Sequence, residues 1–204
     1  MSNYIVINGK RIELTEEQAK DIIAAQTKEE TTVQLSQIAV GDTFKIEDHE
    51  FIVLEHSGDT TAVIRKELLP DMEFGSNNNF DGSDVDEACA EFGDEILEIV
   101  GSGNLVEHTV DLTSDDGLKD YGTVRRRCSL LTADLYRRYV EILDKFNPKD
   151  YWWLATPFST AKHNGSNWVK CVAPSGCVDF GLYFIFDFGV RPFCILKSNI
   201  SVSK

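Results

Sequence analysis

Positive charge is scarce in this sequence. Only 20 lysines and arginines stand against 34 acidic residues, which gives a net charge of -14 at neutral pH. A surface of that sign repels phosphate backbones and anionic lipid headgroups alike. We therefore expect no nucleic-acid partner and no membrane partner.

Long apolar runs are missing as well. No segment approaches the length of about 20 apolar residues that a membrane-spanning helix needs. The opening residues, MSNYIVINGK, lack the basic segment and apolar stretch of a secretion signal. We expect a soluble chain that is cytoplasmic as synthesised, with later association with a virion left open.

The five cysteines form no Cys-x-x-Cys pair and have no histidine at metal-ligand spacing. An odd number of cysteines in a chain made in the cytosol is typical of reduced thiols that pack in the core. We expect no metal and no other cofactor. A hairpin would bring Cys171 and Cys177 close enough for a disulfide if the protein left the cell.

Catalytic motifs are absent too. The four histidines are scattered, and there is no GxSxG elbow, phosphate-binding glycine loop or dinucleotide-binding fingerprint. A Ser-His-Asp triad is recognised by geometry, so the presence of these residue types indicates nothing. We predict a protein that is not an enzyme.

The run NNNFDGSDVDE has a partial likeness to a calcium-binding loop. Placing Asn79, Asp81 and Gly82 at loop positions 3, 5 and 6 puts Ala88 where the bidentate glutamate must stand. Glu87 misses that place by one residue. The run is therefore typical of a solvated loop that leads into a helix.

What the sequence does contain is enough apolar material for one main domain. With 204 residues, 42% of them hydrophobic, the chain can bury one substantial core. Residues 1–34 differ in pattern, with a hairpin around Asn8-Gly9 followed by a helix that Thr15 and Gln18 can cap. We expect an adaptor or arm over 1–34, able to support a homo-oligomer, and one domain over 35–204.

Two helices are expected in the main domain. Apolar spacing predicts a short helix over 85–92, capped by Ser83 or Asp84, and a longer one that begins at Thr132 and ends at Asn147. Alternation and turn residues predict strands at 44–46, 51–55, 61–65, 168–172 and 188–196. The fold class is therefore α+β.

Neither the basic stretch Arg125–Arg127, with Arg137 and Arg138, nor Arg191 is interpreted as a ligand contact. In the stretch from Val124 to Leu131, alternation places Arg125 and Arg127 on one solvated strand face. Arg191 sits within the apolar run FGVRPF, where a buried guanidinium must reach a carboxylate or a cluster of backbone carbonyls. We expect Arg191 to act as a structural clamp.

In residues 177–189, large apolar side chains stand at every second position. A continuous strand there would put Val178, Phe180, Leu182, Phe184, Phe186 and Phe188 on one core-facing side. The opposite, solvated side would carry Asp179, Tyr183, Ile185 and Asp187. A competing interpretation leaves some of these aromatic side chains exposed, as in recognition surfaces.

The motifs near the C-terminus are the most specific in the chain: YWWLATP, SNWVKCV, PSGCV and FGVRPFCILKS. With the preceding CSLLTADLYRRY, they resemble an uncharacterised family of phage and Gram-positive gut-bacterial proteins. Members typically carry an LLS/LLT-x-x-EY segment, a WWLRSP block and a terminal YGVRPAL strand. In this chain Ala155 and Thr156 replace the Arg-Ser of that block.

That family is similar to the C-type-lectin-like fold, which includes enzymes of the formylglycine-generating type and receptor-binding proteins diversified by retroelements. The resemblance implies a domain of short twisted antiparallel sheets, two main helices and long loops, whose last strands present a ligand surface. It also implies that residues 168–187 correspond to the variable segment of diversified relatives. Every residue type between Cys177 and Phe188 can be encoded by an adenine-mutagenised Asn codon.

We therefore expect a non-enzymatic ligand-binding or display domain, phage- or prophage-derived, that recognises a protein or a glycan. The expected contacts are Trp168, Lys170, Asp179, Tyr183, Ile185 and Asp187. Two alternatives remain open. One is a structural virion or assembly protein, and the other is a divergent enzyme of the formylglycine-generating type, which would need an accessible reactive thiol.

Overall fold

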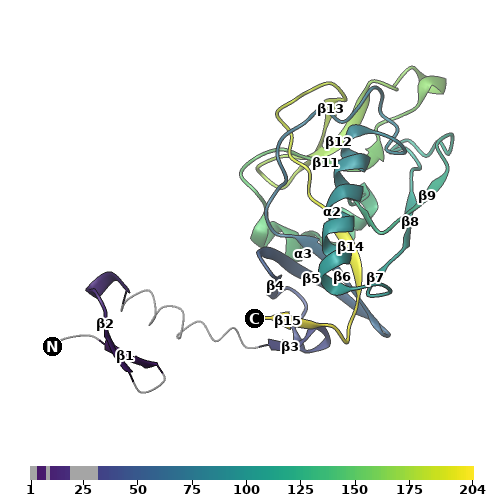
Figure 1. The fold of residues 1–204 in the computed structure, drawn as a ribbon. Coiled ribbons are helices and arrows are strands. Elements are labelled where there is room, and N and C mark those ends of the chain that lie inside the picture. The colour runs from purple at the N-terminus through teal and green to yellow at the C-terminus, as the bar shows by residue number, and fades with distance from the viewer. Residues whose placement is uncertain (1–3, 8–9, 19–31) are drawn as a thin grey trace. The chain divides into compact units, whose positions relative to one another are not determined.

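The computed structural model describes residues 4–7, 10–18 and 32–204. The chain divides into two compact units, residues 1–32 and 33–204. The described part is α+β, with mostly antiparallel sheets and few helices (Figure 1). None of the helices in these ranges has the length and apolar character that crossing a membrane requires.

The N-terminal unit contains a hairpin of β1 (Tyr4–Ile7) and β2 (Lys10–Glu13), paired antiparallel. A capping box follows, as predicted. The Thr15 amide donates to the Gln18 side chain at 3.0 Å, and the Gln18 amide donates to the Thr15 hydroxyl at 3.2 Å. The expected turn at Asn8-Gly9 and the expected apolar stripe of Ala19, Ile22 and Ile23 lie outside the described residues.

The main sheet of the second unit has the strand order β10-β14-β6-β5-β4-β15-β3, and β7 also pairs with β14. The predicted strands at 44–46, 51–55 and 61–65 are confirmed as a meander with slightly wider bounds. The strands are β3 (Thr32–Gln34), β4 (Thr43–Ile46), β5 (His49–Ser57), β6 (Thr60–Arg65), β7 (Leu105–Val106), β10 (Cys128–Ser129), β14 (Phe193–Lys197) and β15 (Ser201–Ser203).

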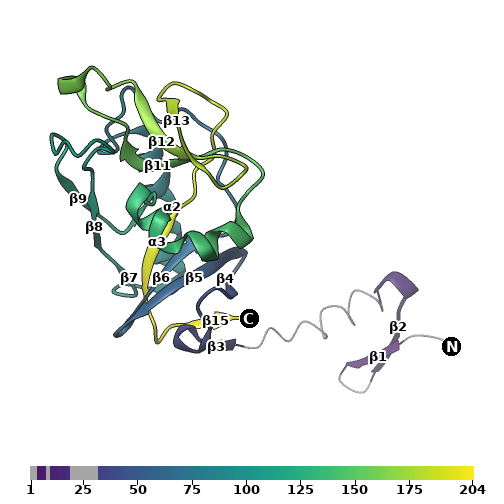
Figure 2. The same cartoon turned by 180° about the vertical axis from the view of Figure 1, so that it is seen from behind.

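One helix covers each face of this sheet, as the two opposite views show (Figures 1 and 2). Alternation along β5 sends Phe51 and Val53 towards α2 (Asp84–Val100) and Ile52 and Leu54 towards α3 (Ala133–Leu143). The cap predicted for α3 is confirmed, because the Thr132 hydroxyl accepts the Leu135 amide at 3.2 Å. Short 3-10 turns lie at Leu35–Gln37, Asp144–Phe146 and Ala161–His163.

The predicted helix over 85–92 is much too short. Ser83 caps α2, as expected, but the helix continues to Val100. Gly93 interrupts the apolar spacing without ending the helix, since a glycine inside a helix costs only about 1 kcal/mol. Packing explains its presence: a Cβ at position 93 would lie 2.9 Å from the Cβ of Cys128.

A smaller sheet of β11 (Trp152–Pro157), β12 (Trp168–Val172) and β13 (Val178–Leu182) carries the motifs YWWLATP, SNWVKCV and PSGCV, whereas FGVRPFCILKS leads into β14 of the main sheet. A separate two-stranded sheet pairs β8 (His108–Asp111) with β9 (Thr123–Arg126). The two adjacent tryptophans of β11 point into different cores. Trp152 packs against Tyr136 of α3, and Trp153 packs against Phe74 and Phe188.

Arg191 is fully buried between the two larger sheets. Its guanidinium donates to the backbone carbonyls of Arg65 at 3.0 Å, Lys66 at 3.2 Å and Phe146 at 3.0 Å. It also lies 5.2 Å from the ring centroid of Trp152. Burial lowers the pKa of Arg191 to about 10, so the group stays charged at neutral pH.

The strand predicted at 188–196 is wrong in its first half, because β14 begins only at Phe193. Residues 188–192 cross from one sheet to the other. Gly189 forms an isolated bridge with Trp152 of the small sheet, and Val190 forms one with Leu69. Pro192 follows, and it has no amide hydrogen to continue a ladder.

Candidate ligand-binding face

Three aromatic side chains lie exposed at one end of the small sheet. Phe158, Trp168 and Phe180, here called the aromatic patch, are 37%, 36% and 46% exposed. The Phe180 ring centroid is 5.1 Å from that of Phe158 and 5.3 Å from that of Trp168. Phe180 thus contacts both other rings, while each of the three keeps a large solvent-facing surface.

The strand register explains this grouping. Lys170 stands opposite Phe180 across β12 and β13, and Trp168 stands two residues before Lys170 on the same face. At the other end of that face, Val172 and Val178 are covered by the core under α3. The face is therefore buried at one end and open at the end that carries the aromatic patch.

A nearly buried ammonium lies beneath the patch. The Nζ atom of Lys170 is 5.7 Å from the ring centroid of Phe158, 5.6 Å from that of Phe180 and 3.4 Å from an oxygen of Asp115. Cation–π contacts of this kind strengthen when they are shielded from water. Lys170 thus fixes the positions of two of the exposed rings from behind.

Asp115 also joins the patch to a polar hollow. Burial acts to raise the pKa of Asp115, but hydrogen bonds and charge from Arg137 and Lys170 outweigh it and lower that pKa. The hollow has a volume of about 270 Å³ and is lined by hydroxyls and charged groups, including those of Thr132, Asp134 and Thr156. Apolar rings and polar groups therefore lie close together.

The loop that carries Phe158 is held by a buried asparagine. The Asn78 amide nitrogen donates to the carbonyls of Ser159 at 2.8 Å, Gly165 at 3.3 Å and Trp168 at 2.9 Å. Its oxygen accepts the Tyr121 hydroxyl at 2.7 Å. All of its hydrogen-bonding atoms are occupied, so Asn78 fixes both ends of this loop.

A carboxylate adds a second support. Asp116 accepts hydrogen bonds from the hydroxyls of Ser114 at 2.5 Å and Ser159 at 2.7 Å and from His163 at 2.9 Å. These three bonds hold the pKa of Asp116 well below its usual range. The loop bearing Phe158 is thus preorganised, which lowers the entropy lost on binding a ligand.

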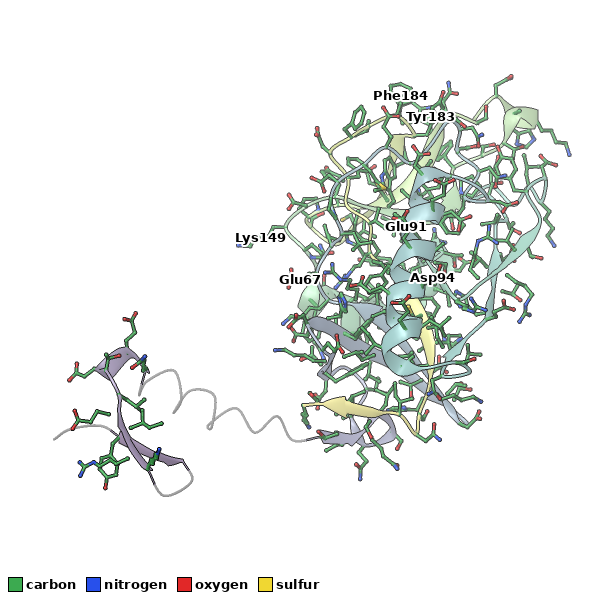
Figure 3. All side chains as sticks on the ribbon, viewed as in Figure 1. Glu67, Glu91, Asp94, Lys149, Tyr183 and Phe184 are labelled. Atoms are coloured by element: carbon green, nitrogen blue, oxygen red, sulfur yellow. The ribbon has the colours of Figure 1, made fainter. Side chains whose placement is uncertain are left out.

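The core-facing side predicted for residues 177–189 is wrong in its middle. Val178 and Phe188 pack against the core, as predicted, but three phenylalanines between them are exposed, as the competing interpretation expected. The strand ends at Leu182, and the following loop leaves Phe184 48% exposed and Phe186 67% exposed. Phe180 is also solvent-facing, whereas Tyr183 and Ile185, predicted to be solvated, pack against the core around Trp153. Figure 3 shows Tyr183 and Phe184 beside β13.

The six expected contact residues therefore do not lie together on one surface. Trp168 and Lys170 lie at the aromatic patch, Lys170 with its side chain covered. Asp179 is half-buried with its carboxylate accepting the Phe180 amide at 2.9 Å, and Asp187 is exposed on the loop after β13. Sequence reasoning missed Phe158 and Phe180 as candidate contacts. The clustering of aromatic residues around Trp168 was the available signal.

Two carboxylates of the calcium-like run, those of Asp81 and Asp86, bind an arginine. Arg126 donates to Asp86 at 2.7 and 2.6 Å and to Asp81 at 2.6 Å. These bonds, first of all those to Asp86, raise the pKa of Arg126 above its ordinary value. Within residues 4–7, 10–18 and 32–204, no group of three or more histidine, cysteine or acidic side chains is arranged to hold a metal ion.

The remaining arginines of the basic stretch, Arg125 and Arg127, are exposed, as the alternation predicts. All five cysteines are free thiols. Cys177 is exposed at the turn after β12, and Cys171 is buried, with burial raising the pKa of its thiol to about 12. Searches against family models, curated proteins and solved structures returned no match for the chain.

Proposed function

We propose that this chain is a non-enzymatic ligand-binding or display domain of phage or prophage origin, which recognises a protein or a glycan through the aromatic patch. The observation that carries the proposal is the concentration of exposed aromatic surface over residues 158–186. Five exposed aromatic residues lie there: Phe158, Trp168, Phe180, Phe184 and Phe186. The first three are grouped through contacts of Phe180, and exposed apolar groups gathered in this way with polar groups at the rim are typical of recognition sites.

The surroundings of the patch support binding. Its rings rest on Lys170, and the Phe158 loop is fixed by Asn78 and Asp116. Rigid aromatic side chains supply large contact areas at low entropy cost. The polar hollow beside Asp115 offers hydrogen-bonding partners next to the rings. The C-terminal motifs further support a C-type-lectin-like fold, in which the last strands carry the ligand surface.

A screen of the full chain on a glycan array and against a displayed-peptide library tests this proposal. The wild-type protein should retain ligands that the folded variant Trp168→Ser/Phe180→Ser does not retain. Val140→Ser is a matched control, because Val140 is an exposed apolar residue on α3. Equal retention by wild type and the patch variant would overturn the proposal.

One observation favours a second function, that of an assembly protein anchored by its N-terminal unit. Tyr4 and Ile12 of the β1–β2 hairpin are 50% and 44% exposed, and an isolated two-stranded hairpin is marginally stable in water. If this unit mediates assembly, deleting residues 1–31, which leaves β3 whole, should reduce an oligomer to a monomer in light scattering. An unchanged mass would exclude that role for the unit.

A further inference from the structure

Three buried thiols from separate elements meet beneath α2. Cys89 lies in α2, Cys128 in β10 and Cys194 in β14, and none is more than 2% exposed. The Sγ atoms of Cys128 and Cys194 are 3.0 Å apart. Cys89 lies near enough to Cys128 to contribute to the raised pKa of the Cys128 thiol. Of the five cysteines in the chain, Cys89 and Cys194 thus both lie next to Cys128.

The register of β10 and β14 suits a covalent link. Cys128 and Cys194 stand directly opposite each other in an antiparallel pair. Opposed residues in such pairs have Cα atoms about 4.5–5.5 Å apart. This separation lies within the range of roughly 4.4–6.8 Å that a disulfide spans. A bond between the two sulfurs therefore needs little backbone movement.

A small cavity leads to Cys128. It has a volume of about 190 Å³ and lies between α2 and the end of β9. Its lining comprises Ala90, Gly93, Asp94, Glu107, Arg125, Arg126, Arg127 and Cys128, so three positive groups face two negative ones. Asp94 is visible on α2 in Figure 3. The absence of a side chain at Gly93 leaves Cys128 next to the cavity.

We propose that Cys128 and Cys194 are a modification site, at which an intramolecular disulfide forms by exchange with a small anionic disulfide of the glutathione class. The Cys128 thiolate attacks one sulfur of the oxidised reagent, which forms a mixed disulfide and releases one reduced thiol. Cys194 then attacks the Cys128 sulfur and releases the second. The two protein thiols lose two electrons and two protons, and the reagent takes up both.

The environment sets the rate of this reaction. Burial and the neighbouring thiols raise the pKa of Cys128 well above its usual value, so little thiolate is present at neutral pH. The exchange should therefore be slower than glutathionylation of the exposed Cys177 and should accelerate as the pH rises. The arginines at the cavity favour an anionic reagent over a neutral one.

The test incubates the full native chain with oxidised glutathione at pH 8, quenches it with acid and alkylates it with N-ethylmaleimide after denaturation. Peptide mapping without reduction should show a link between Cys128 and Cys194, glutathione on Cys177, and alkylated Cys89 and Cys171. Alkylation of both Cys128 and Cys194 after incubation has continued long past complete glutathionylation of Cys177 would overturn the proposal. A link from Cys128 to Cys89 would overturn it as well.

Cysteine variants test whether Cys194 is the partner of Cys128 in the disulfide. In folded Cys194→Ser, the link should disappear and Cys128 should keep glutathione as a mixed disulfide. The control variants Cys89→Ser and Cys177→Ser should still form the link to the wild-type extent. If Cys194→Ser does not fold, Cys194→Ala takes its place, and the wild-type map alone still decides whether the bond forms. A link that persists in a Cys194 variant would contradict the assignment.

Discussion

Replacing Arg191 with methionine is expected to lower the free energy of unfolding by about 3–5 kcal/mol, measured by urea denaturation. Methionine fills much of the same space but donates no hydrogen bond. The carbonyls of Arg65, Lys66 and Phe146 would each lose a charged donor in a buried position. These carbonyls belong to the end of β6 and the turn after α3. The lost hydrogen bonds therefore connect these two segments to the strand crossing that carries Arg191.

Two further variants control for this prediction. Arg191→Lys keeps the charge, but one ammonium cannot reach three carbonyls at once, so its effect should be intermediate. Arg138→Met removes an exposed arginine that donates to Glu55 at 2.9 Å, and its effect should stay below about 1 kcal/mol. A change below about 1 kcal/mol for Arg191→Met would show that Arg191 does not act as a clamp.

The second large effect is expected in binding. For a ligand selected with the wild-type protein, Trp168→Ser/Phe180→Ser should raise the Kd by at least about 100-fold in isothermal titration calorimetry. Exposed aromatic anchors commonly contribute about 2 kcal/mol or more each when a ligand covers them. The substitutions remove solvent-facing rings, so the unfolding free energy should change by only about 1 kcal/mol.

The binding result is judged against a control variant and against the folding of the patch variant itself. The control Val140→Ser should leave the Kd unchanged, because Val140 lies on α3. A Kd that changes less than about threefold in the folded patch variant would show that the selected ligand binds elsewhere. An affinity loss accompanied by loss of the near-ultraviolet circular dichroism signal would instead indicate that the variant has misfolded.

Local patterns predicted the helix starts and the meander well. Thr132 and Ser83 cap helices because hydroxyls satisfy the first free amides, which is a property of a few neighbouring residues. The strands at 43–65 alternate and are separated by polar turns. Such features depend on short segments and so are legible in sequence.

The errors arose where packing between distant segments decides the structure. The helix predicted over 85–92 stopped just before Gly93, a position where the lack of a side chain accommodates Cys128. Alternation over 177–189 could not show that the strand ends at Leu182, nor that the core covers only one end of the β12–β13 face. The exposed position of Phe180 follows from that uneven cover, as does the aromatic patch itself.

The ligand site at the aromatic patch can be tested most directly by nuclear magnetic resonance. The measurement follows the indole NH signal of Trp168 in a ¹H–¹⁵N spectrum while a selected ligand is added. The chain has three tryptophans, and Trp152 and Trp153 are fully buried, so they serve as internal controls. A ligand that binds at the aromatic patch should cause a saturable shift of the Trp168 signal and much smaller shifts of the other two. Saturation of binding with an unchanged Trp168 signal would contradict a ligand site at the aromatic patch.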